Sequence, residues 1–286
     1  MDAMLNMIRM ELYRMFHTKS LYIIWFILTA GILFTTSLSA EEWKTYTMEE
    51  KQEQYEYATG QRTDDQVNFG MNVTIPTKPG DEVSVFDLFY ANIKGKFIAL
   101  FMVIFAVLFS TADLTSGFVK NIGGQVRNRG SLVLAKAAVL FGYTGLTMLL
   151  FVVVQAVSNA VFFGNLTFGP WKTFLSYGAL QILLHFAFVV IAMGIAIVLH
   201  NNVISMVVVV CMCMNALTIF YGFLDKVIEK FGVEDFHVIK YTVSGNITML
   251  GMNMAEKTVH ASLIASAGFI LVMLTICSIV FQKRDI

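Results

Sequence analysis

Residues 113–136 read DLTSGFVKNIGGQVRNRGSLVLAK, a basic stretch that is interrupted by glycines. The apolar run Phe97–Ala112 precedes this stretch, and the apolar run Ser131–Phe163 begins within it. A helix needs about 20 apolar residues to cross a hydrocarbon core about 30 Å thick. The first run approaches that length when the apolar residues at helical spacing before it, from Val85 to Ile93, are added. The stretch is therefore predicted to be a loop between two membrane spans.

The composition of the whole chain agrees with this interpretation. Of its 286 residues, 57% are hydrophobic and 14% are charged, and the mean hydropathy is +0.68. A soluble domain of this size could not hide so much apolar surface from water. The net charge is zero, so the charge of the whole chain says nothing about nucleic acid or acidic substrates. For this membrane protein we expect no nucleic-acid partner. The three cysteines lie in apolar runs, so no framework of soluble disulfides is expected.

Six stretches are long and apolar enough to be predicted as membrane spans. A helix is the open-ended element that satisfies its own backbone hydrogen bonds in lipid. The expected fold is therefore an all-α integral membrane protein with six transmembrane helices in a single domain, residues 1–286. The spans are Leu21–Ala40, Phe97–Ala112, Ser131–Phe163, Thr173–Leu199, Val203–Leu224 and Ala261–Phe281.

The orientation follows from lysines and arginines in the short segments beside the spans, which favour the cytoplasmic side. The N-terminus, the stretch 113–136 and the C-terminus together carry nine basic and four acidic residues. With six spans, both termini are expected in the cytoplasm. The loop 41–96 and the hairpin 225–260 between spans five and six are expected outside.

Residues 1–19 show helical periodicity before the first span. Met4, Ile8, Leu12 and Met15 recur at intervals of three and four residues, while polar side chains fall on other sides of the helix. This pattern is typical of a helix that lies in the membrane interface and contacts lipid. The alternative is that these residues are the polar start of the first span.

Motifs for catalysis are absent from the sequence. It has no phosphate-binding G-x-x-x-x-G-K-[ST] loop, no G-x-S-x-G nucleophile elbow and no H-E-x-x-H zinc helix, so we predict no catalytic or metal-binding residues. The polar residues inside the spans are candidates for a translocation path, and hydrogen bonds between helices are the alternative role. They are Gln155, Asn159, Gln181, His185 and Asn215.

The segment 114–130 is longer than a passive linker requires. Its apolar residues Leu114, Phe118, Val119 and Ile122 fall at helical intervals before the break at Gly123–Gly124. A short amphipathic helix at the cytoplasmic mouth can dock into a groove of a soluble partner. The alternative is that its cations only set the topology.

The same stretch resembles the loop between the second and third spans of type-2 ABC exporter permeases, especially the bacitracin- and lantibiotic-resistance permeases of Gram-positive bacteria. The matching residues are Asp113, Gly117, Lys120, Asn121, Arg129 and Lys136. Glu11, Arg14 and Lys19, just before the first span, resemble the interfacial elbow helix of these permeases. The resemblance covers the whole chain.

The resemblance implies a permease subunit in the plasma membrane of a Gram-positive bacterium. Residues 114–130 would be its coupling helix, to which Phe118 and Arg127 would also contribute. The chain would bind no cofactor, and ATP and Mg would bind to two copies of a separate ATPase subunit. A second permease, identical or homologous, would complete the exporter. The implied cargo is amphipathic or hydrophobic, with antimicrobial peptides among the candidates.

Two other classes of protein remain open. One is a sensor or assembly protein without transport activity, in which the outer loop 41–96 binds the ligand. The other is a membrane-embedded enzyme that uses His185 or His200.

Overall fold

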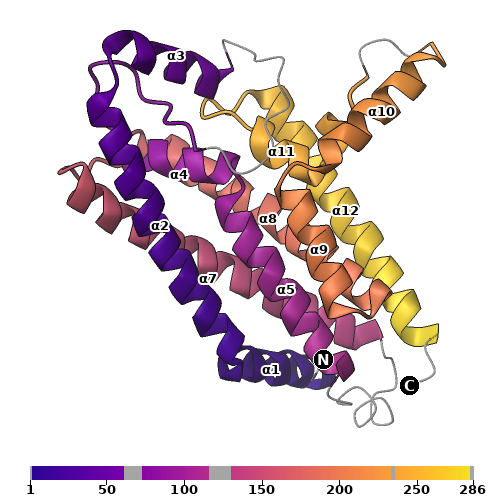
Figure 1. The fold of residues 1–286 in the computed structure, drawn as a ribbon. Coiled ribbons are helices and arrows are strands. Elements are labelled where there is room, and N and C mark those ends of the chain that lie inside the picture. Colours follow the sequence, from indigo (N-terminus) through magenta and orange to yellow (C-terminus); the bar gives the residue numbers. More distant parts are fainter. Residues whose placement is uncertain (1, 61–72, 116–129, 233–235, 284–286) are drawn as a thin grey trace.

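The computed structural model is a bundle of helices (Figure 1). It describes residues 2–60, 73–115, 130–232 and 236–283, and these residues contain no strand. The predicted all-α class is therefore confirmed for this part of the chain. The predicted coupling helix 114–130 lies almost entirely outside the described residues.

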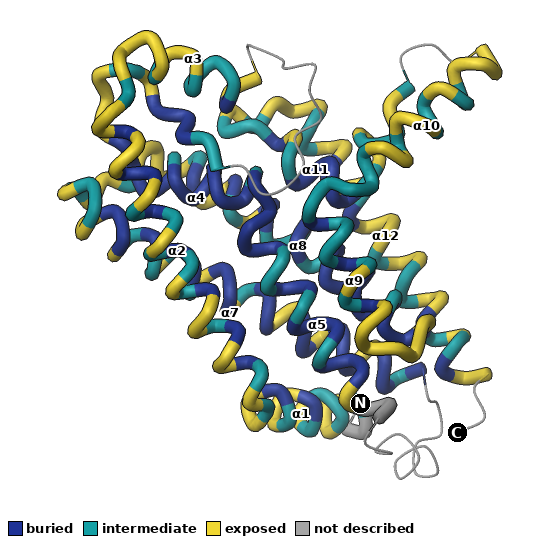
Figure 2. Tube along the Cα trace, in the orientation of Figure 1, coloured by how far each residue is buried: buried dark blue, intermediate teal, exposed yellow. Residues whose placement is uncertain are grey.

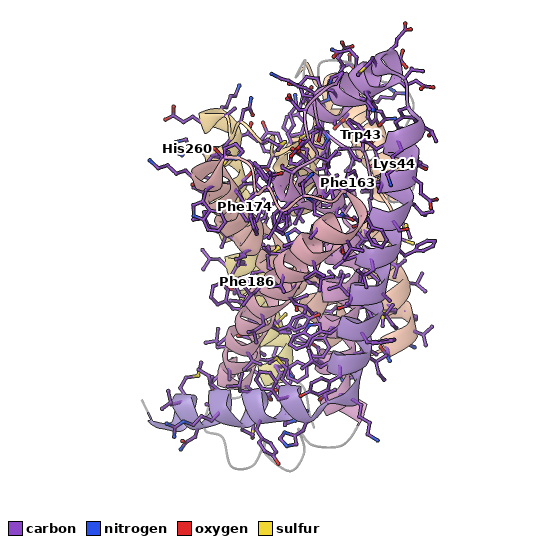
Figure 3. All side chains as sticks on the ribbon, turned by 90° about the vertical axis from the view of Figure 1, so that its left-hand side faces the viewer. Trp43, Lys44, Phe163, Phe174, Phe186 and His260 are labelled. Atoms are coloured by element: carbon purple, nitrogen blue, oxygen red, sulfur yellow. The ribbon has the colours of Figure 1, made fainter. Side chains whose placement is uncertain are left out.

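Helix α1 (Asp2–His17) lies across one end of the bundle, and α2 (Lys19–Thr45) rises steeply from it, as Figures 1 and 3 show. The two helices meet at Thr18, which has an extended backbone. Its hydroxyl donates a hydrogen bond to the Arg14 carbonyl at 2.7 Å. The predicted helix in residues 1–19 is thus present and separate from α2.

The second predicted span consists of two helices, α4 (Val85–Lys94) and α5 (Phe97–Thr115), which are bent by 55°. We expected the residues before Phe97 to extend its helix, and they form a helix of their own instead. Lys96, at the break, has a φ of 58°, a left-handed conformation that a helix does not allow. α4 begins at Ser84 with a capping box, in which Ser84 and Asp87 bond to each other's backbone N–H.

Two long helices follow, α7 (Gly130–Phe162) and α8 (Trp171–Leu199). α8 contacts α5, α7 and α12 and carries many buried residues, so it lies at the centre of the bundle (Figure 2). Aromatic rings fill the space between α4 and α8, where Phe89 packs edge to face against Phe174 at 5.3 Å between ring centroids.

The predicted span Val203–Leu224 is broken into α9 (Asn202–Cys213) and α10 (Leu217–Glu229), which are bent by 69°. Asn215, between them, has a φ of 58°. A single continuous helix was therefore the wrong prediction here, because asparagine readily adopts the left-handed conformation that ends a helix. α10 projects away from the bundle and has no buried residue (Figures 1 and 2).

The other described helices are short, except α12. α3 (Met48–Thr59) begins with a capping box, and hydrogen bonds from Thr47 lower the pKa of the Glu50 carboxyl. The 3-10 helix η1 (Val238–Tyr241) and α11 (Val243–Met249) precede the last long helix, α12 (Glu256–Lys283). Figure 3 shows Trp43 and Phe163 near each other towards the α3 end of the bundle, where both belong to a small apolar cluster.

Four of the described helices, α2, α7, α8 and α12, are long and apolar enough to cross a membrane. The number rises to six if each bent pair, α4–α5 and α9–α10, forms one span. The outward faces of α2 and α12 expose large apolar side chains such as Phe26, Ile264 and Leu271 (Figure 2). Such faces suit contact with lipid rather than water.

Candidate functional site

A buried ion pair joins α1 to α7. The Lys136 ammonium lies 3.1 Å from the Glu11 carboxylate, and the Arg14 guanidinium lies 3.0 Å from the other oxygen of that carboxylate. Glu11 is 2% exposed and Lys136 is 5% exposed. The spacing of three residues places Glu11 and Arg14 on the same side of α1, towards the first turns of α7. Glu11 and Arg14, predicted for the elbow helix, therefore contact Lys136, which was predicted to belong to the loop between two spans.

The side chain of Phe109 brings α5 into the same cluster. The Lys136 ammonium lies 4.2 Å from the centroid of the Phe109 ring, and the Arg14 guanidinium lies 5.9 Å from it. An aromatic ring attracts a cation near its face, more strongly where water is excluded. A displacement of α1 would thus act on α5 and α7 together. We call Glu11, Arg14, Lys136 and Phe109 the α1 corner.

The other predicted residues near this end are placed as follows. Lys19 is exposed at the first turn of α2. Asp113 lies near the end of α5. The remaining predicted coupling residues lie outside the described residues, and they are Gly117, Phe118, Lys120, Asn121, Arg127 and Arg129.

Gln155 and Asn159, one turn apart on α7, are fully buried and bonded to neighbouring segments. The Gln155 amide donates to the Thr36 hydroxyl of α2 at 3.1 Å and accepts from the Asn92 amide of α4 at 3.2 Å. The Asn159 amide donates to the Asn165 side-chain oxygen at 2.8 Å. These contacts join α7 to α2, to α4 and to the loop after α7.

Gln181 and His185 on α8 form a second buried group. The Gln181 amide donates to the Tyr177 hydroxyl at 3.0 Å and to the Ile247 carbonyl of α11 at 3.3 Å. The His185 Nδ1 lies 2.8 Å from the Gln181 carbonyl, and its Nε2 is buried without a partner among the described residues. The histidine is therefore bonded within its own helix rather than to a neighbouring one.

The fifth predicted path residue, Asn215, contacts a residue that the sequence analysis left out. The Lys96 ammonium donates to the Asn215 side-chain oxygen and to the Ser244 hydroxyl of α11, the latter at 2.6 Å. Lys96 is 2% exposed and forms no ion pair with a described carboxylate. The breaks in the two bent helix pairs are thus tied to each other and to α11. We call Lys96, Asn215 and Ser244 the break bridge.

The sequence did contain a feature that could have identified Lys96 as a functional residue. Residues 85–108 are apolar apart from Asp87, Asn92 and the pair Lys94 and Lys96 beside Gly95, and a lysine inside an apolar segment is costly enough to indicate a specific role. The sequence analysis placed Lys96 at the end of an outer loop, and the bend between α4 and α5 explains why that position is buried instead.

Helix α11 is held by contacts with four neighbouring segments. Besides Ser244 and Ile247, its Asn246 accepts a hydrogen bond from Ser262 of α12 at 3.0 Å. Gly245 lies so close to the carbonyl of Ile239 in η1 that a Cβ atom would collide with it. The polar residues predicted for a path therefore fall into separate hydrogen-bonded groups, and those of Gln181 and Asn215 include α11.

The histidine, cysteine and acidic side chains of the described residues do not cluster as metal ligands. The described residues contain no group of three such side chains placed to hold a metal ion. Cys211, Cys213 and Cys277 are free thiols. His260, which Figure 3 labels at the edge of the bundle, lies 3.7 Å from Glu256 on the same helix.

Comparison with known proteins places the chain in a family. Residues 54–286 match the family model described as "Protein of unknown function (DUF2705)". No curated protein matches the sequence. The match covers all of the described helices from α4 to α12, together with the break bridge and Lys136. The chain therefore belongs to the DUF2705 family.

Proposed function

We propose that the chain is the membrane-spanning permease subunit of an ATP-driven ABC exporter that moves amphipathic or hydrophobic molecules out of the cell or the membrane. In this proposal it crosses the membrane six times, with α4–α5 and α9–α10 as bent spans and both termini in the cytoplasm. The segment 114–130 then docks on a separate ATPase subunit, which binds Mg and ATP and hydrolyses the ATP. A second permease completes the exporter.

The α1 corner is the observation that carries the proposal. Lys136 follows the docking segment by only six residues and is bonded to Glu11 of α1. A force applied to the docking segment would therefore reach α1 and α7 together. Such a buried ion pair is costly to form, and this cost supports a role in which α1 and α7 must stay in contact and move as one unit.

The contacts of α7 would transmit this force to the other end of the bundle. α7 packs against α2, α8 and α12, and Gln155 bonds it to α2 and α4. A tilt of α7 would therefore shift α4, whose break carries Lys96. In the proposed cycle, ATP-driven closure of the two ATPases tilts α7, the break bridge opens, and α11 separates from its neighbours to let the cargo pass.

The test is purification of the tagged chain from its native membranes at its natural expression level. The expected result is an ATPase subunit that copurifies with the chain and whose hydrolysis rate changes on reconstitution with it. Replacement of Glu11 by glutamine should weaken this coupling while the ATPase remains bound. Purification of the chain without any ATPase, or unaltered coupling in Glu11→Gln, would contradict the proposal.

A further inference from the structure

A cavity of about 720 Å³ is lined by residues of α3, α4 and the segment after α11. These elements lie at the end of the bundle opposite α1 (Figure 1). Cavities of about 300–1,000 Å³ are the size that encloses a small organic ligand. This cavity has no part in the α1 corner or the break bridge. Its lining comes from five segments, represented by Tyr55, Thr77, Asp87, Thr167 and Asn253.

Hydrogen bonds fix the walls of the cavity to α4. The Asp87 carboxylate accepts from the Thr77 hydroxyl at 2.8 Å and from the Ser84 backbone N–H at 2.9 Å. The Val85 backbone N–H donates to the Thr167 carbonyl at 2.8 Å. The lining loops that carry Thr77 and Thr167 are thus bonded to the first turn of α4, which fixes this side of the cavity.

The wall formed by α3 is held at its C-terminal end. The Lys94 ammonium donates to the Ala58 carbonyl at 2.6 Å, and the Tyr90 hydroxyl approaches the same carbonyl at 3.5 Å. A cation at the C-terminus of a helix is also favoured by the helix dipole. These contacts hold α3, and with it Tyr55, in place at the cavity.

The charge of the lining is negative. Among the described residues of the lining, Asp81, Glu82 and Asp87 are acidic and Lys78 is the one basic residue. Asp87 is engaged in the wall, whereas the side-chain carboxylates of Asp81 and Glu82 are exposed and form no hydrogen bond or ion pair with another described residue. An excess of two negative charges attracts cations to the cavity and disfavours anions.

Aromatic and apolar surface lies beside these carboxylates. Tyr55, Tyr90, Pro76, Pro170 and Met252 contribute to the lining. The Lys78 ammonium lies 6.0 Å from the centroid of the Tyr55 ring, about the greatest distance at which an aromatic ring attracts a cation. The acidic residues are not placed to hold a metal ion, because the described residues contain no such cluster.

We propose that the cavity between α3, α4 and the segment 251–253 binds an organic cation that carries an aromatic or apolar body. The ammonium of the ligand pairs with Asp81 and Glu82, and its apolar body packs against Tyr55 and the neighbouring prolines. Binding requires neither an ATPase nor a second chain. The inference therefore goes beyond the proposed export and can be tested apart from it.

The test uses dansylcadaverine, an aromatic primary amine, and the full chain in nanodiscs of zwitterionic lipid, with empty nanodiscs as background. The fluorescence titration should give saturable binding that weakens with added salt. The double variant Asp81→Asn, Glu82→Gln should bind about five- to tenfold more weakly, because each exposed carboxylate contributes a factor of a few. Glu49→Gln, an exposed carboxylate of α3 outside the lining, is the matched control and should bind as the wild type does.

A second pair of variants tests the aromatic wall. Tyr55→Ala should weaken binding about tenfold, whereas Tyr55→Phe should preserve it, because the ring and not the hydroxyl contacts the ligand. Equal binding of dansylglycine, its anionic counterpart, would overturn the proposal. So would an unchanged dissociation constant in the double carboxylate variant. Normal dansylcadaverine binding by a chain that copurifies with no ATPase would remove the export proposal and leave the cavity assigned.

Discussion

The α1 corner predicts an unequal response to loss of its two bonded partners, Glu11 and Lys136. At 3.1 Å the pair has a Coulomb energy of about 5 kcal/mol at an effective dielectric constant of about 20. Glu11→Gln leaves the cations Arg14 and Lys136 close together without the carboxylate between them. The expected loss of unfolding free energy is about 3–5 kcal/mol, the usual cost of breaking a buried pair from one side.

Lys136→Met should be tolerated better. Glu11 keeps the Arg14 guanidinium at 3.0 Å, and the methionine fills the apolar space beside Phe109. The expected loss is about 1–3 kcal/mol. The double variant Glu11→Gln, Lys136→Met should be more stable than Glu11→Gln alone, because the buried lysine charge has been removed as well.

The assay is reversible unfolding in mixed micelles, titrated with sodium dodecyl sulfate and followed by tryptophan fluorescence. Trp25, which donates a hydrogen bond to Thr147 of α7 at 2.9 Å, reports on the packing of α2 against α7. Glu41→Gln, an exposed glutamate on α2, is the control and should have wild-type stability. Equal losses in the two single variants, or strictly additive losses in the double variant, would refute the reasoning.

Three other predictions concern the opposite end of the bundle and the docking segment. Gly245→Ala should lower the unfolding free energy by about 1–3 kcal/mol in the same assay, because the new methyl group meets a backbone carbonyl of η1, whereas Gly268→Ala, where a Cβ atom meets nothing within 4 Å, should have little effect. Lys96→Met should speed maleimide labelling of the buried Cys213, because the break bridge is lost. The labelling rate is measured by mass spectrometry in a chain whose other two cysteines are replaced by serine. An unchanged rate would mean that Lys96 does not hold the breaks together. Gly117→Pro should uncouple hydrolysis from transport at normal expression, measured as cargo moved per phosphate released, and a normal ratio would show that the segment is only a linker.

The sequence predicted the helical class and most helix positions because their signals are local. Long apolar runs and helical periodicity identified α1, α2, α7, α8 and α12 to within a few residues at each end, apart from an outer extension of α2 and the first turn of α12. The two bends were missed because they depend on single left-handed residues. Lysine and asparagine also occur within straight helices, so the identity of Lys96 and Asn215 alone did not locate the bends.

The candidate sites were predictable only in part. The sequence identified Glu11 and Lys136 separately, through resemblance to a family, and gave no sign that the two side chains would meet. That contact depends on how α1 crosses the first turn of α7, which is a tertiary property. The cavity over α4 combines residues from five segments, and no local pattern in the sequence relates them.

The central claim is that the energy for this chain's function enters from a separate ATPase at the α1 end of the bundle. The most direct measurement is cross-linking between a cysteine introduced at position 120 and the ATPase that copurifies with the chain, read by mass spectrometry with and without ATP. We expect a cross-link at position 120 whose yield changes with ATP, and none from a cysteine introduced at position 49 of α3. A chain that carries out its activity with no ATPase bound, or a cross-link from position 49 alone, would contradict it.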